Sequence, residues 1–327
     1  MSHQIKVGIV GGAGNTGGEL IRLLLHHEKV QIAFVHSTSH AGALVSSIHT
    51  DLLGDTHLAF ASELNADIDV LFLCVGHGDA KKFLETNTIA SSTKIIDLSQ
   101  DFRLTSQNKI GDRTFVYGLP ELQKAAIQSA QNIANPGCFA TAIQLGLLPL
   151  ADKGMVVDVY TTGITGSTGA GQGFNATSHF SWRANNIQAY KTLQHQHLHE
   201  IHQSLHQLQG DAKAQVHFVP WRGDFTRGIF VTSVLDTKES LESLYHLYTS
   251  FFASHPFVQV SKSPIDLKQV VNTNKCFIQL EQQGNKIAIH SVIDNLLKGA
   301  VGQAVQNMNL LFEFPETTGL QLKASQF

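Results

Sequence analysis

Residues 5–25 carry the feature that most constrains the fold. An apolar run, Ile5 to Val10, precedes a glycine-rich segment at 11–18, and a second apolar stretch follows at 20–25. The glycines satisfy G-x-G-x-x-G and also G-x-x-G-x-x-G. This order predicts a strand, a tight turn and a helix whose first backbone N–H groups can hold a pyrophosphate, although a purely structural glycine turn is the alternative. The candidate cofactor-binding residues here are Gly11, Gly12, Gly14, Asn15, Thr16 and Gly17.

Length and composition indicate a two-domain α/β protein. The chain has 327 residues, more than one core usually supports, with 43% hydrophobic and 15% charged residues. Its net charge of −3, without a Lys/Arg cluster, argues against nucleic acid and against an anionic membrane surface as partner. Three scattered cysteines are too few for a disulfide framework or a paired zinc site. No apolar run reaches the ~18 residues that span a bilayer, so we expect a cytoplasmic protein.

The end of the second predicted strand bears on the choice of cofactor. After residues 31–35 the chain reads His36-Ser37-Thr38-Ser39-His40, with no acidic residue. An NAD-binding fold usually offers a carboxylate there to the ribose 2′-OH, and a carboxylate repels a 2′-phosphate. Hydroxyl groups can bind that phosphate, so Ser37 and Ser39 are candidate contacts and NADP is favoured over NAD. A merely polar turn is the alternative.

A third predicted strand lies at 69–75 and is almost continuously apolar, as in a parallel strand covered on both faces. Cys74 lies within it, and we interpret this cysteine as a core residue. Gly76 follows at the carboxyl end of the strand, where sheets of this kind bind ligands. Gly76 is therefore another candidate for the cofactor site.

The segment Asn135-Pro136-Gly137-Cys138-Phe139-Ala140-Thr141 places a thiol where a turn meets an apolar helix. We predict that this helix ends at Pro149. A thiol at a helix N-terminus is favoured as thiolate, and the same N–H groups can stabilise an oxyanion when the sulfur attacks a carbonyl. Cys138 is thus a candidate nucleophile, and an inert buried cysteine is the alternative.

A cluster of histidines occupies residues 195–206. If this segment is one helix, His195, His199, His202 and His206 form a stripe at i, i+4, i+7 and i+11. The pattern falls one residue short of H-E-x-x-H, so we expect no metal site. A histidine acting as acid/base toward the Cys138 sulfur is the favoured interpretation.

Other polar features of the chain are ambiguous when taken alone. A glycine-rich loop at 163–173 lacks the ending of a P-loop, so close approach to a ligand and plain flexibility both remain open. Arg103, Arg222 and Arg227 suit anionic groups, but each on its own is better interpreted as a solvated charge. A hairpin at 277–293 and a small-residue helix at 301–310 follow, and we predict that this helix packs back on the first domain.

Together these motifs resemble the N-acetyl-γ-glutamyl-phosphate reductases of arginine biosynthesis, within the wider aspartate-semialdehyde dehydrogenase-like group. The resemblance runs over nearly the whole chain in the order of the family. The segments that carry it are Gly14-Asn15-Thr16-Gly17-Gly18-Glu19-Leu20, Asp97-Leu98-Ser99-Gln100-Asp101-Phe102-Arg103-Leu104, Tyr117-Gly118-Leu119-Pro120-Glu121-Leu122, Asn135 to Thr141, Ala189-Tyr190-Lys191 with His195-Gln196-His197, and Ile293 to Asn309.

The resemblance implies a fold, a reaction and a set of site residues. It implies a Rossmann-type NADP-binding domain at 1–137, completed by 298–327, and an α+β catalytic and dimerisation domain at 138–297. Cys138 is then the nucleophile that forms a thioester, NADPH the reductant and a small acyl phosphate the substrate, in a homo-oligomer (dimer or tetramer) without a metal. The resemblance implies that His195 is the acid/base, with His197 less favoured. It implies that the substrate is bound by Arg103, His197, Arg227 and Asn135. The residues implied to contact the nicotinamide are Gly166, Gly169 and Asn307.

The chain also departs from the family pattern. It has Thr38 where the family commonly has arginine and Gln172 where a basic residue is common, and its segment 221–225 is individual to this chain. Acetyl is the default acyl group, and a succinyl group is an open alternative. Related acyl phosphates (aminoadipyl, aspartyl), a non-catalytic NADP-binding regulator and a cysteine hydrolase remain competing hypotheses.

Overall fold

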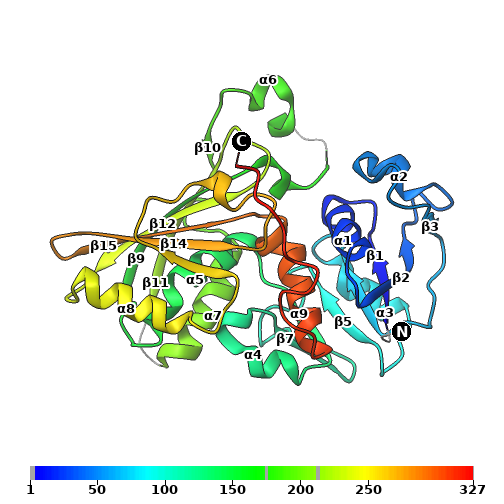
Figure 1. Cartoon of the computed structure of the whole chain (residues 1–327), viewed down its shortest axis with the longest axis horizontal. Coiled ribbons are helices and arrows are strands. Elements are labelled where there is room, and N and C mark those ends of the chain that lie inside the picture. Colours follow the sequence, from blue (N-terminus) through cyan, green and yellow to red (C-terminus); the bar gives the residue numbers. More distant parts are fainter. Residues whose placement is uncertain (1–3, 174–175, 211–213, 327) are drawn as a thin grey trace. The chain divides into compact units, whose positions relative to one another are not determined.

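The computed structural model describes residues 4–173, 176–210 and 214–326 and divides into two compact units (Figure 1). Unit 1 contains the described residues of Met1–Pro136 and Ala300–Gln321, and unit 2 contains those of Gly137–Gly299 and Leu322–Phe327. The two-domain α/β prediction is confirmed. In contrast to the sequence-based assignment, residues 322–326 group with unit 2, where the Ser325 N–H donates to the Val271 carbonyl (3.1 Å).

Unit 1 is built on a mostly parallel sheet. Within residues 4–136 the strand order is β3-β2-β1-β4-β5-β8-β7-β6, and the β6–β7 pair is antiparallel. The strands are β1 (Ile5–Val10), β2 (Val30–His36), β3 (Phe60–Ala61), β4 (Val70–Leu73), β5 (Lys94–Asp97), β6 (Lys109–Ile110), β7 (Arg113–Tyr117) and β8 (Asn132–Ala134). The helices are α1 (Asn15–Leu25), α2 (Val45–Ile48), α3 (Asp79–Thr86), α4 (Pro120–Gln128) and α9 (Gly302–Leu311).

The central strands of this sheet are buried on both faces, which explains their apolar sequences. All four residues of β4 are buried, and so are Val7 and Ile9 of β1. Val10 at the end of β1 pairs with His36 of β2 on one side and with Leu73 of β4 on the other. The segments that follow these three strands therefore meet at one edge of the sheet, the edge where such folds bind ligands.

Helix α9 closes unit 1, as predicted for the C-terminal helix. It packs against α1 and α4, and all its residues are buried. Asn309 on α9 bonds the ring of His27 (Nε2 to Oδ1, 3.0 Å) and donates to the carbonyls of Glu316 and Thr318. A residue far along the chain thereby becomes part of the first domain.

Unit 2 contains a mixed sheet with the order β10-β11-β9-β12-β15-β14-β13 among its described residues. The β9–β11 and β13–β14 pairs are parallel and the others antiparallel. The strands are β9 (Asp158–Thr165), β10 (Gln188–Ala189), β11 (Gln215–Arg222), β12 (Ile229–Asp236), β13 (Val258–Ser261), β14 (Cys276–Gln283) and β15 (Lys286–Ile293). The helices are α5 (Cys138–Ala151), α6 (Phe180–Arg183), α7 (His197–Gln209) and α8 (Leu241–Phe251), and a π-helical turn, Leu297–Val301, leads into α9.

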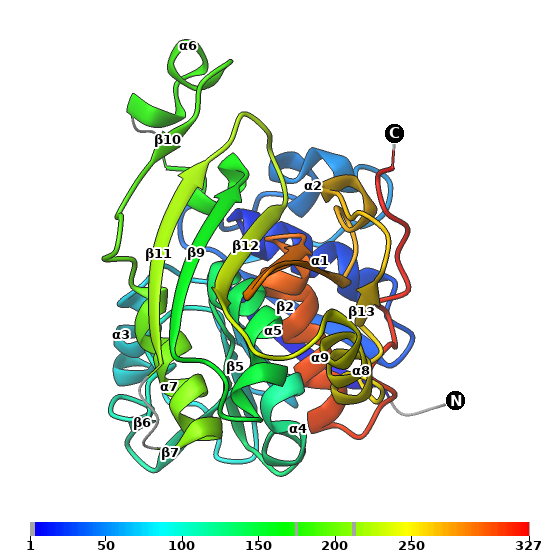
Figure 2. The same cartoon turned by 90° about the vertical axis from the view of Figure 1, so that its left-hand side faces the viewer.

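The two faces of this sheet differ. Helices α5, α7 and α8 pack on one face, and Figure 2 shows α5 behind β9 and β12. On the other face Tyr160 is 62% exposed, and Trp221 and Phe230 border a shallow hollow of about 270 Å³. Residues along β9 and β12 alternate between buried and more exposed positions, so one face forms core and the other a surface with aromatic side chains.

One helix boundary predicted from the sequence is wrong, and the histidine stripe considered for residues 195–206 is not formed. Helix α5 does not end at Pro149 but continues to Ala151, because a proline in the last turn removes only one helical N–H and the Asp152 N–H still reaches the Leu148 carbonyl (2.9 Å). Helix α7 begins at His197, so His195 precedes it and the stripe of four histidines does not form.

Candidate active site

Cys138 is the first residue of α5, a helix whose remaining residues are all buried. Its N-cap is Gly137, which is extended (φ −72°, ψ 151°) and has no side chain to cap the helix. The N–H groups of the first turn precede the first intrahelical hydrogen bond, in which the Thr141 N–H donates to the Gly137 carbonyl (2.8 Å). Cys138 is half-buried, whereas the other two cysteines are buried.

The turn before Cys138 is held by a carboxylate that we did not predict. The Gly137 N–H donates to Glu200 Oε2 (3.0 Å), and the other oxygen of Glu200 lies 3.9 Å from His197 Nε2. A Cβ at Gly137 would lie 2.4 Å from that ring nitrogen, so only glycine fits. Glu200 follows His197 by three residues on α7, a spacing that places both side chains on one helix face and could have revealed this pair.

His195 lies in an aromatic environment beside this turn. Its ring centroid is 5.8 Å from Phe139, 5.5 Å from Phe218 and 4.5 Å from the ring of His197. Its Nδ1 accepts from the His197 N–H (3.3 Å), which assigns the proton of the neutral ring to Nε2. Burial lowers the pKa of His195 to about 4, with a smaller effect of Lys191. The imidazole is therefore neutral near pH 7 and can accept a proton.

Tyr190 lies against the same histidine. The two ring centroids are 5.8 Å apart, and the Cζ atom of Arg222 lies 4.6 Å from the centroid of the Tyr190 ring. Burial raises the pKa of Tyr190 well above its ordinary value, and the negative charge of Cys138 adds to this effect. The sequence favoured a solvated loop charge for Arg222, but β11 extends to this residue and packs it on Tyr190.

The remaining cysteines are core residues, as predicted for Cys74 from its strand. Burial raises the pKa of Cys74 to about 12, and Asp97 adds to the shift. Cys276, which begins β14, is fully buried beside the hydroxyl of Ser291 (3.4 Å). Neither thiol is suited to act as a nucleophile.

The glycine-rich segment of unit 1 fits a dinucleotide. Gly14 is the N-cap of α1, and Gly11 has φ +80° with its Cα facing the Cys74 carbonyl, where a Cβ would lie 2.4 Å away. The space at Gly14 is open instead, because a Cβ there would meet its nearest atom at 3.8 Å. The segment thus exposes backbone at a helix start, the arrangement that accepts a pyrophosphate.

The predicted 2′-phosphate contacts lie at the same sheet edge. The Gly12 N–H donates to the His36 carbonyl (3.1 Å), and Ser37 Oγ is 3.4 Å from Ser39 Oγ. Gly76 follows β4, the other neighbour of β1. Asn15 and Thr16 open α1. All of these candidates remain predictions as cofactor contacts.

Three predicted site residues of unit 1 hold one another in place. Arg103 is buried and donates from Nε to the Asn135 carbonyl (2.8 Å) and from Nη2 to the Leu98 carbonyl (3.2 Å). Asn135 donates to the Ala300 carbonyl (2.9 Å), and Asn307 donates to Asn135 Oδ1 (3.2 Å) and to the Gly118 carbonyl (2.8 Å). The structure thus shows these residues bonded to one another within unit 1, and their contacts with substrate or nicotinamide stay predictions.

Arg227 and the loop with Gly166 and Gly169 are organised by two neighbouring residues of unit 2. Asp294 accepts from Arg227 Nε (3.1 Å) and Nη2 (3.3 Å), which fixes the guanidinium. Asn295 accepts from the Gly228 N–H (2.7 Å) and donates to Thr168 Oγ1 (3.0 Å), so it joins this turn to the glycine loop.

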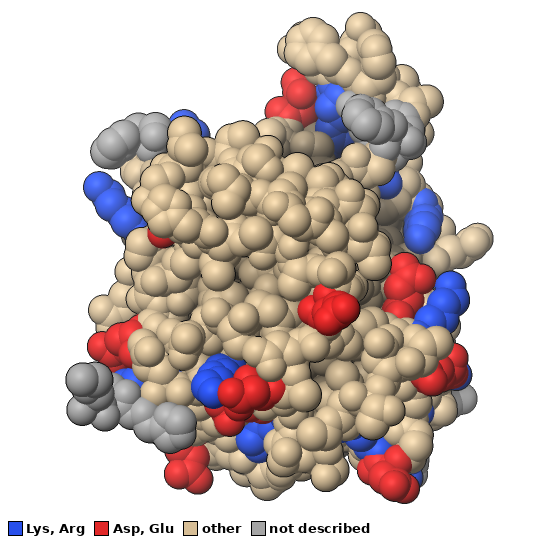
Figure 3. Space-filling model, turned by 90° about the vertical axis from the view of Figure 1, so that its right-hand side faces the viewer, with Lys and Arg blue, Asp and Glu red and all other residues tan. Residues whose placement is uncertain are grey.

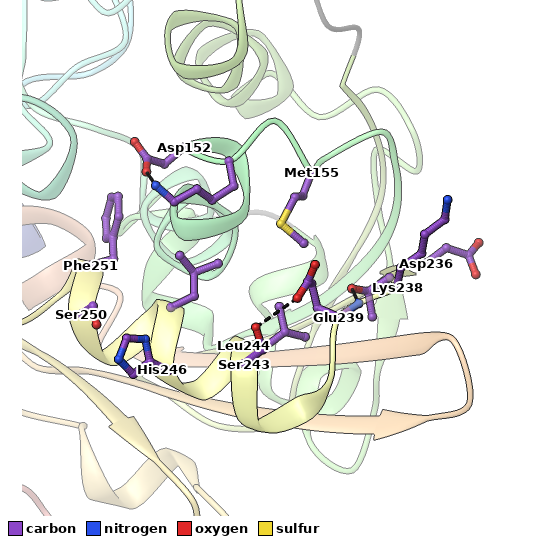
Figure 4. Close-up of a pocket in the computed structure, with 13 residues that line it drawn as sticks. Asp152, Met155, Asp236, Lys238, Glu239, Ser243, Leu244, His246, Ser250 and Phe251 are labelled. Atoms are coloured by element: carbon purple, nitrogen blue, oxygen red, sulfur yellow. Dashed lines mark hydrogen bonds and ion pairs between the residues drawn. The ribbon is translucent and has the colours of Figure 1, made fainter.

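Among the described residues, no three His, Cys, Asp or Glu side chains are grouped for a metal ion, and no helix is long and apolar enough to cross a membrane. On the face drawn in Figure 3, Lys and Arg side chains lie mostly near Asp or Glu. A hollow of about 920 Å³ lies beside α8, between Asp152 and Phe251 (Figure 4). It is at the opposite end of α5 from Cys138, roughly 20 Å along the helix.

Comparison with known proteins defines the class first. Residues 6–130 match the family "Semialdehyde dehydrogenase, NAD binding domain" and residues 138–295 match "Semialdehyde dehydrogenase, dimerisation domain". The fold is similar to that of aspartate semialdehyde dehydrogenase II from Vibrio cholerae (TM-score 0.75, 16% identity, 95% of this chain and 99% of that one). It is also similar to the aspartate semialdehyde dehydrogenase with NADP from Candida albicans (TM-score 0.66, 14% identity, 94% and 98%).

Full-length relatives then define the family. The chain is 56% identical to an N-acetyl-gamma-glutamyl-phosphate reductase of Bacteroides fragilis over 326 residues, 99% of this chain and 100% of that protein. It is 54% identical to the protein of that name from Flavobacterium johnsoniae over 325 residues, again 99% and 100%. The chain belongs to the N-acetyl-gamma-glutamyl-phosphate reductase family.

Proposed function

We propose that this protein reduces N-acetyl-γ-glutamyl phosphate to N-acetylglutamate semialdehyde and phosphate, with NADPH, in arginine biosynthesis. The observation that carries the proposal is the half-buried Cys138 at the start of α5, with Glu200 on the preceding N–H and His195 beside the next residue. Relatives at 56% and 54% identity bear the corresponding name.

Cys138 and His195 carry the covalent chemistry in this proposal. Neutral His195 accepts the thiol proton, and the Cys138 sulfur attacks the acyl carbon of the acyl phosphate. The bond to phosphate breaks, the imidazolium returns its proton to the departing phosphate, and a thioester remains on Cys138. N–H groups in the first turn of α5 stabilise the oxyanion of this addition.

The second half of the reaction needs the cofactor. The Gly11–Gly17 segment and α1 would hold the pyrophosphate, with Ser37 and Ser39 toward a 2′-phosphate. When bound, NADPH would supply a hydride to the thioester carbon, and the aldehyde forms when the carbon–sulfur bond of the resulting hemithioacetal breaks. The sulfur then leaves as thiolate, and the α5 N–H groups stabilise it until it takes a proton from solvent. Arg103 and Arg227 are proposed to bind the phosphate and the α-carboxylate of the substrate.

The assay that tests this proposal runs in the reverse direction. Purified enzyme is mixed with NADP, phosphate and one semialdehyde at a time: N-acetylglutamate, aminoadipate or aspartate semialdehyde. NADPH formation that requires phosphate and prefers the N-acylated glutamate substrate is expected. NADP binding without turnover of any semialdehyde would support a regulator instead, and turnover of an ester without NADP would support a hydrolase.

We also propose that the enzyme is a homodimer or a larger assembly built on the open face of the unit 2 sheet. This region matches a dimerisation domain, and Tyr160 on this face is 62% exposed in the single chain. Tyr160→Asp should shift the mass measured by light scattering toward the monomer, while Lys286→Gln at the end of β15 should not. An unchanged mass for Tyr160→Asp would place the interface elsewhere.

A further inference from the structure

Two arginines lie near Tyr190, which packs beside His195: Arg183 on α6, before β10, and Arg222 at the end of β11. Antiparallel pairing sets Gln188 opposite Arg222 and Ala189 opposite Trp221, and the Tyr190 N–H donates to the Pro220 carbonyl (3.0 Å). This pairing folds the α6 segment over the end of β11. It brings Arg183, the last residue of α6, into electrostatic range of Arg222 and Tyr190.

Arg183 is a partly buried cation on α6. Its Nε and Nη2 atoms are buried and have no hydrogen-bond partner among the described residues. Burial lowers the pKa of Arg183, and the positive charge of Arg222 lowers it further, while Asp224 and Tyr190 act in the opposite direction. Asp224 accepts from the Asn185 N–H (2.6 Å). Arg183 thus has one guanidinium and one carboxylate as charged neighbours, and buried donors without a hydrogen bond are costly unless an anion binds them.

Arg222 connects this pair to the reacting groups. Its Cζ lies 4.6 Å from the Tyr190 ring centroid, its Nη1 donates to Thr177 Oγ1 (3.0 Å), and Tyr190 lies 5.8 Å from His195 between ring centroids. Arg222 and His195 therefore both lie against the Tyr190 ring, so the guanidinium is at most about 10 Å from the imidazole. An anion held by the two arginines would be part of the same substrate site.

The separation indicates which part of a substrate reaches the arginines. In a glutamyl phosphate the phosphate is attached to the reacting carbon, and the α-carboxylate is at most about 5 Å from it when extended. A carboxylate at the end of a four-carbon N-acyl group reaches about 10 Å. The N-acyl arm is therefore the part of the molecule that spans the Tyr190 ring.

We propose that Arg183 and Arg222 form a carboxylate-binding subsite for the acyl group, so that the enzyme prefers an N-acyl substrate whose acyl group ends in a carboxylate over the N-acetyl substrate. This inference rests on the proposed function and specifies its substrate. Guanidinium groups bind carboxylates through paired N–H donors, and a partly buried site strengthens such bonds.

The test compares N-succinylglutamate semialdehyde with N-acetylglutamate semialdehyde in the reverse assay, with NADP and phosphate. The wild-type enzyme should show a kcat/KM at least about 10-fold higher for the succinyl substrate. Arg183→Gln and Arg222→Gln should lower kcat/KM for the succinyl substrate by about 10-fold to 100-fold and change the acetyl value less than about 3-fold. Arg22→Gln, on α1, is the matched control and should change neither.

Each other result decides the question as well. Equal losses for both substrates, or a wild-type preference for acetyl, overturn the subsite while leaving the proposed function intact. A raised KM for phosphate with unchanged acyl selectivity assigns the arginines to the phosphate instead. If neither semialdehyde is turned over, the proposed function itself fails. Should the Gln variants unfold, Arg183→Lys and Arg222→Lys replace them, and the rise in Tm given by N-succinylglutamate compared with N-acetylglutamate provides a second readout.

Discussion

The starts of α1 and α5 use the same backbone arrangement for different purposes. Both helices begin after a glycine N-cap in the extended region (Gly14, φ −80° and ψ 170°; Gly137, φ −72° and ψ 151°). A glycine has no side chain that could cap the helix. The space before Gly14 is open, whereas His197 and Glu200 fill the space at Gly137. A helix N-terminus favours negative charge in both cases, and the surrounding side chains decide whether a ligand or a protein thiolate supplies it.

The largest expected effect is a loss of turnover without a loss of cofactor binding, because the nucleophile is at the start of α5 and the cofactor is proposed to bind at the start of α1. Cys138→Ser should lower kcat by about 10³-fold or more, because a serine hydroxyl is a far weaker nucleophile than a thiolate. NADP affinity, measured by fluorescence titration, should stay within about 3-fold of wild type. Cys276→Ala is the control and should keep turnover. Substantial turnover by the serine variant would show that the reaction does not pass through Cys138.

A matched pair of alanine substitutions tests the difference between the two caps. Gly137→Ala places a Cβ 2.4 Å from His197 Nε2 and 2.7 Å from Glu200 Oε1, so the free energy of unfolding should fall by about 1–3 kcal/mol. Gly14→Ala meets its nearest atom at 3.8 Å, so stability should be unchanged while the Kd for NADP rises about 10-fold. Denaturant unfolding and NADP titration measure the two effects. The comparison fails if both variants behave alike.

Glu200 on α7 accepts a hydrogen bond from the N-cap N–H of α5, and replacing its carboxylate tests that bond. Glu200→Gln weakens the charge-assisted bond to the Gly137 N–H, so kcat should fall about 10-fold with little change in NADP affinity. Removing a negative charge near the thiol should also move the thiolate limb of the pH–rate profile to lower pH. Glu242→Gln, at an exposed position of α8, is the control. An unshifted profile with normal kcat would remove Glu200 from the site.

The smallest expected effect concerns stability in acid. The pKa of His195 in the folded protein is about 4, below its ordinary value of 6.5, so the unfolded chain takes up a proton first as the pH falls. Stability should therefore decline from about pH 6.5 toward about pH 4, and the lowered pKa values of His27 and His202 act in the same direction. His195→Asn should flatten the decline and His246→Asn should not. Equal slopes in urea unfolding across this range would contradict the shift.

The sequence predicted what local patterns can specify. The glycine segment before α1 and the thiol at the start of α5 are both recognisable from residue order, because a turn followed by an apolar helix has a local signature. Glu200 and Arg222 were missed because their roles arise from packing: one faces a turn more than sixty residues earlier in the chain, and the other is packed on Tyr190 by strand pairing.

The errors at helix ends have physical causes. The sequence left open whether His195 belongs to a helix with the histidines that follow it. Helix α7 begins two residues later, and the ring of His195 packs on Phe139 and Phe218 instead. Pro149 was expected to end α5, but burial of the whole helix stabilises two further residues. Arg103, Asn135 and Asn307 were expected at ligands, and the structure shows the bonds they make within unit 1.

The most direct test of the account is to trap the acyl group on Cys138. Enzyme is mixed rapidly with NADP and the preferred N-acylglutamate semialdehyde in the absence of phosphate, which prevents the thioester from being released. The account predicts a burst of about one NADPH per active site and a mass increase on the peptide that contains Cys138. A burst that is absent, or an acyl group on any other residue, would contradict it.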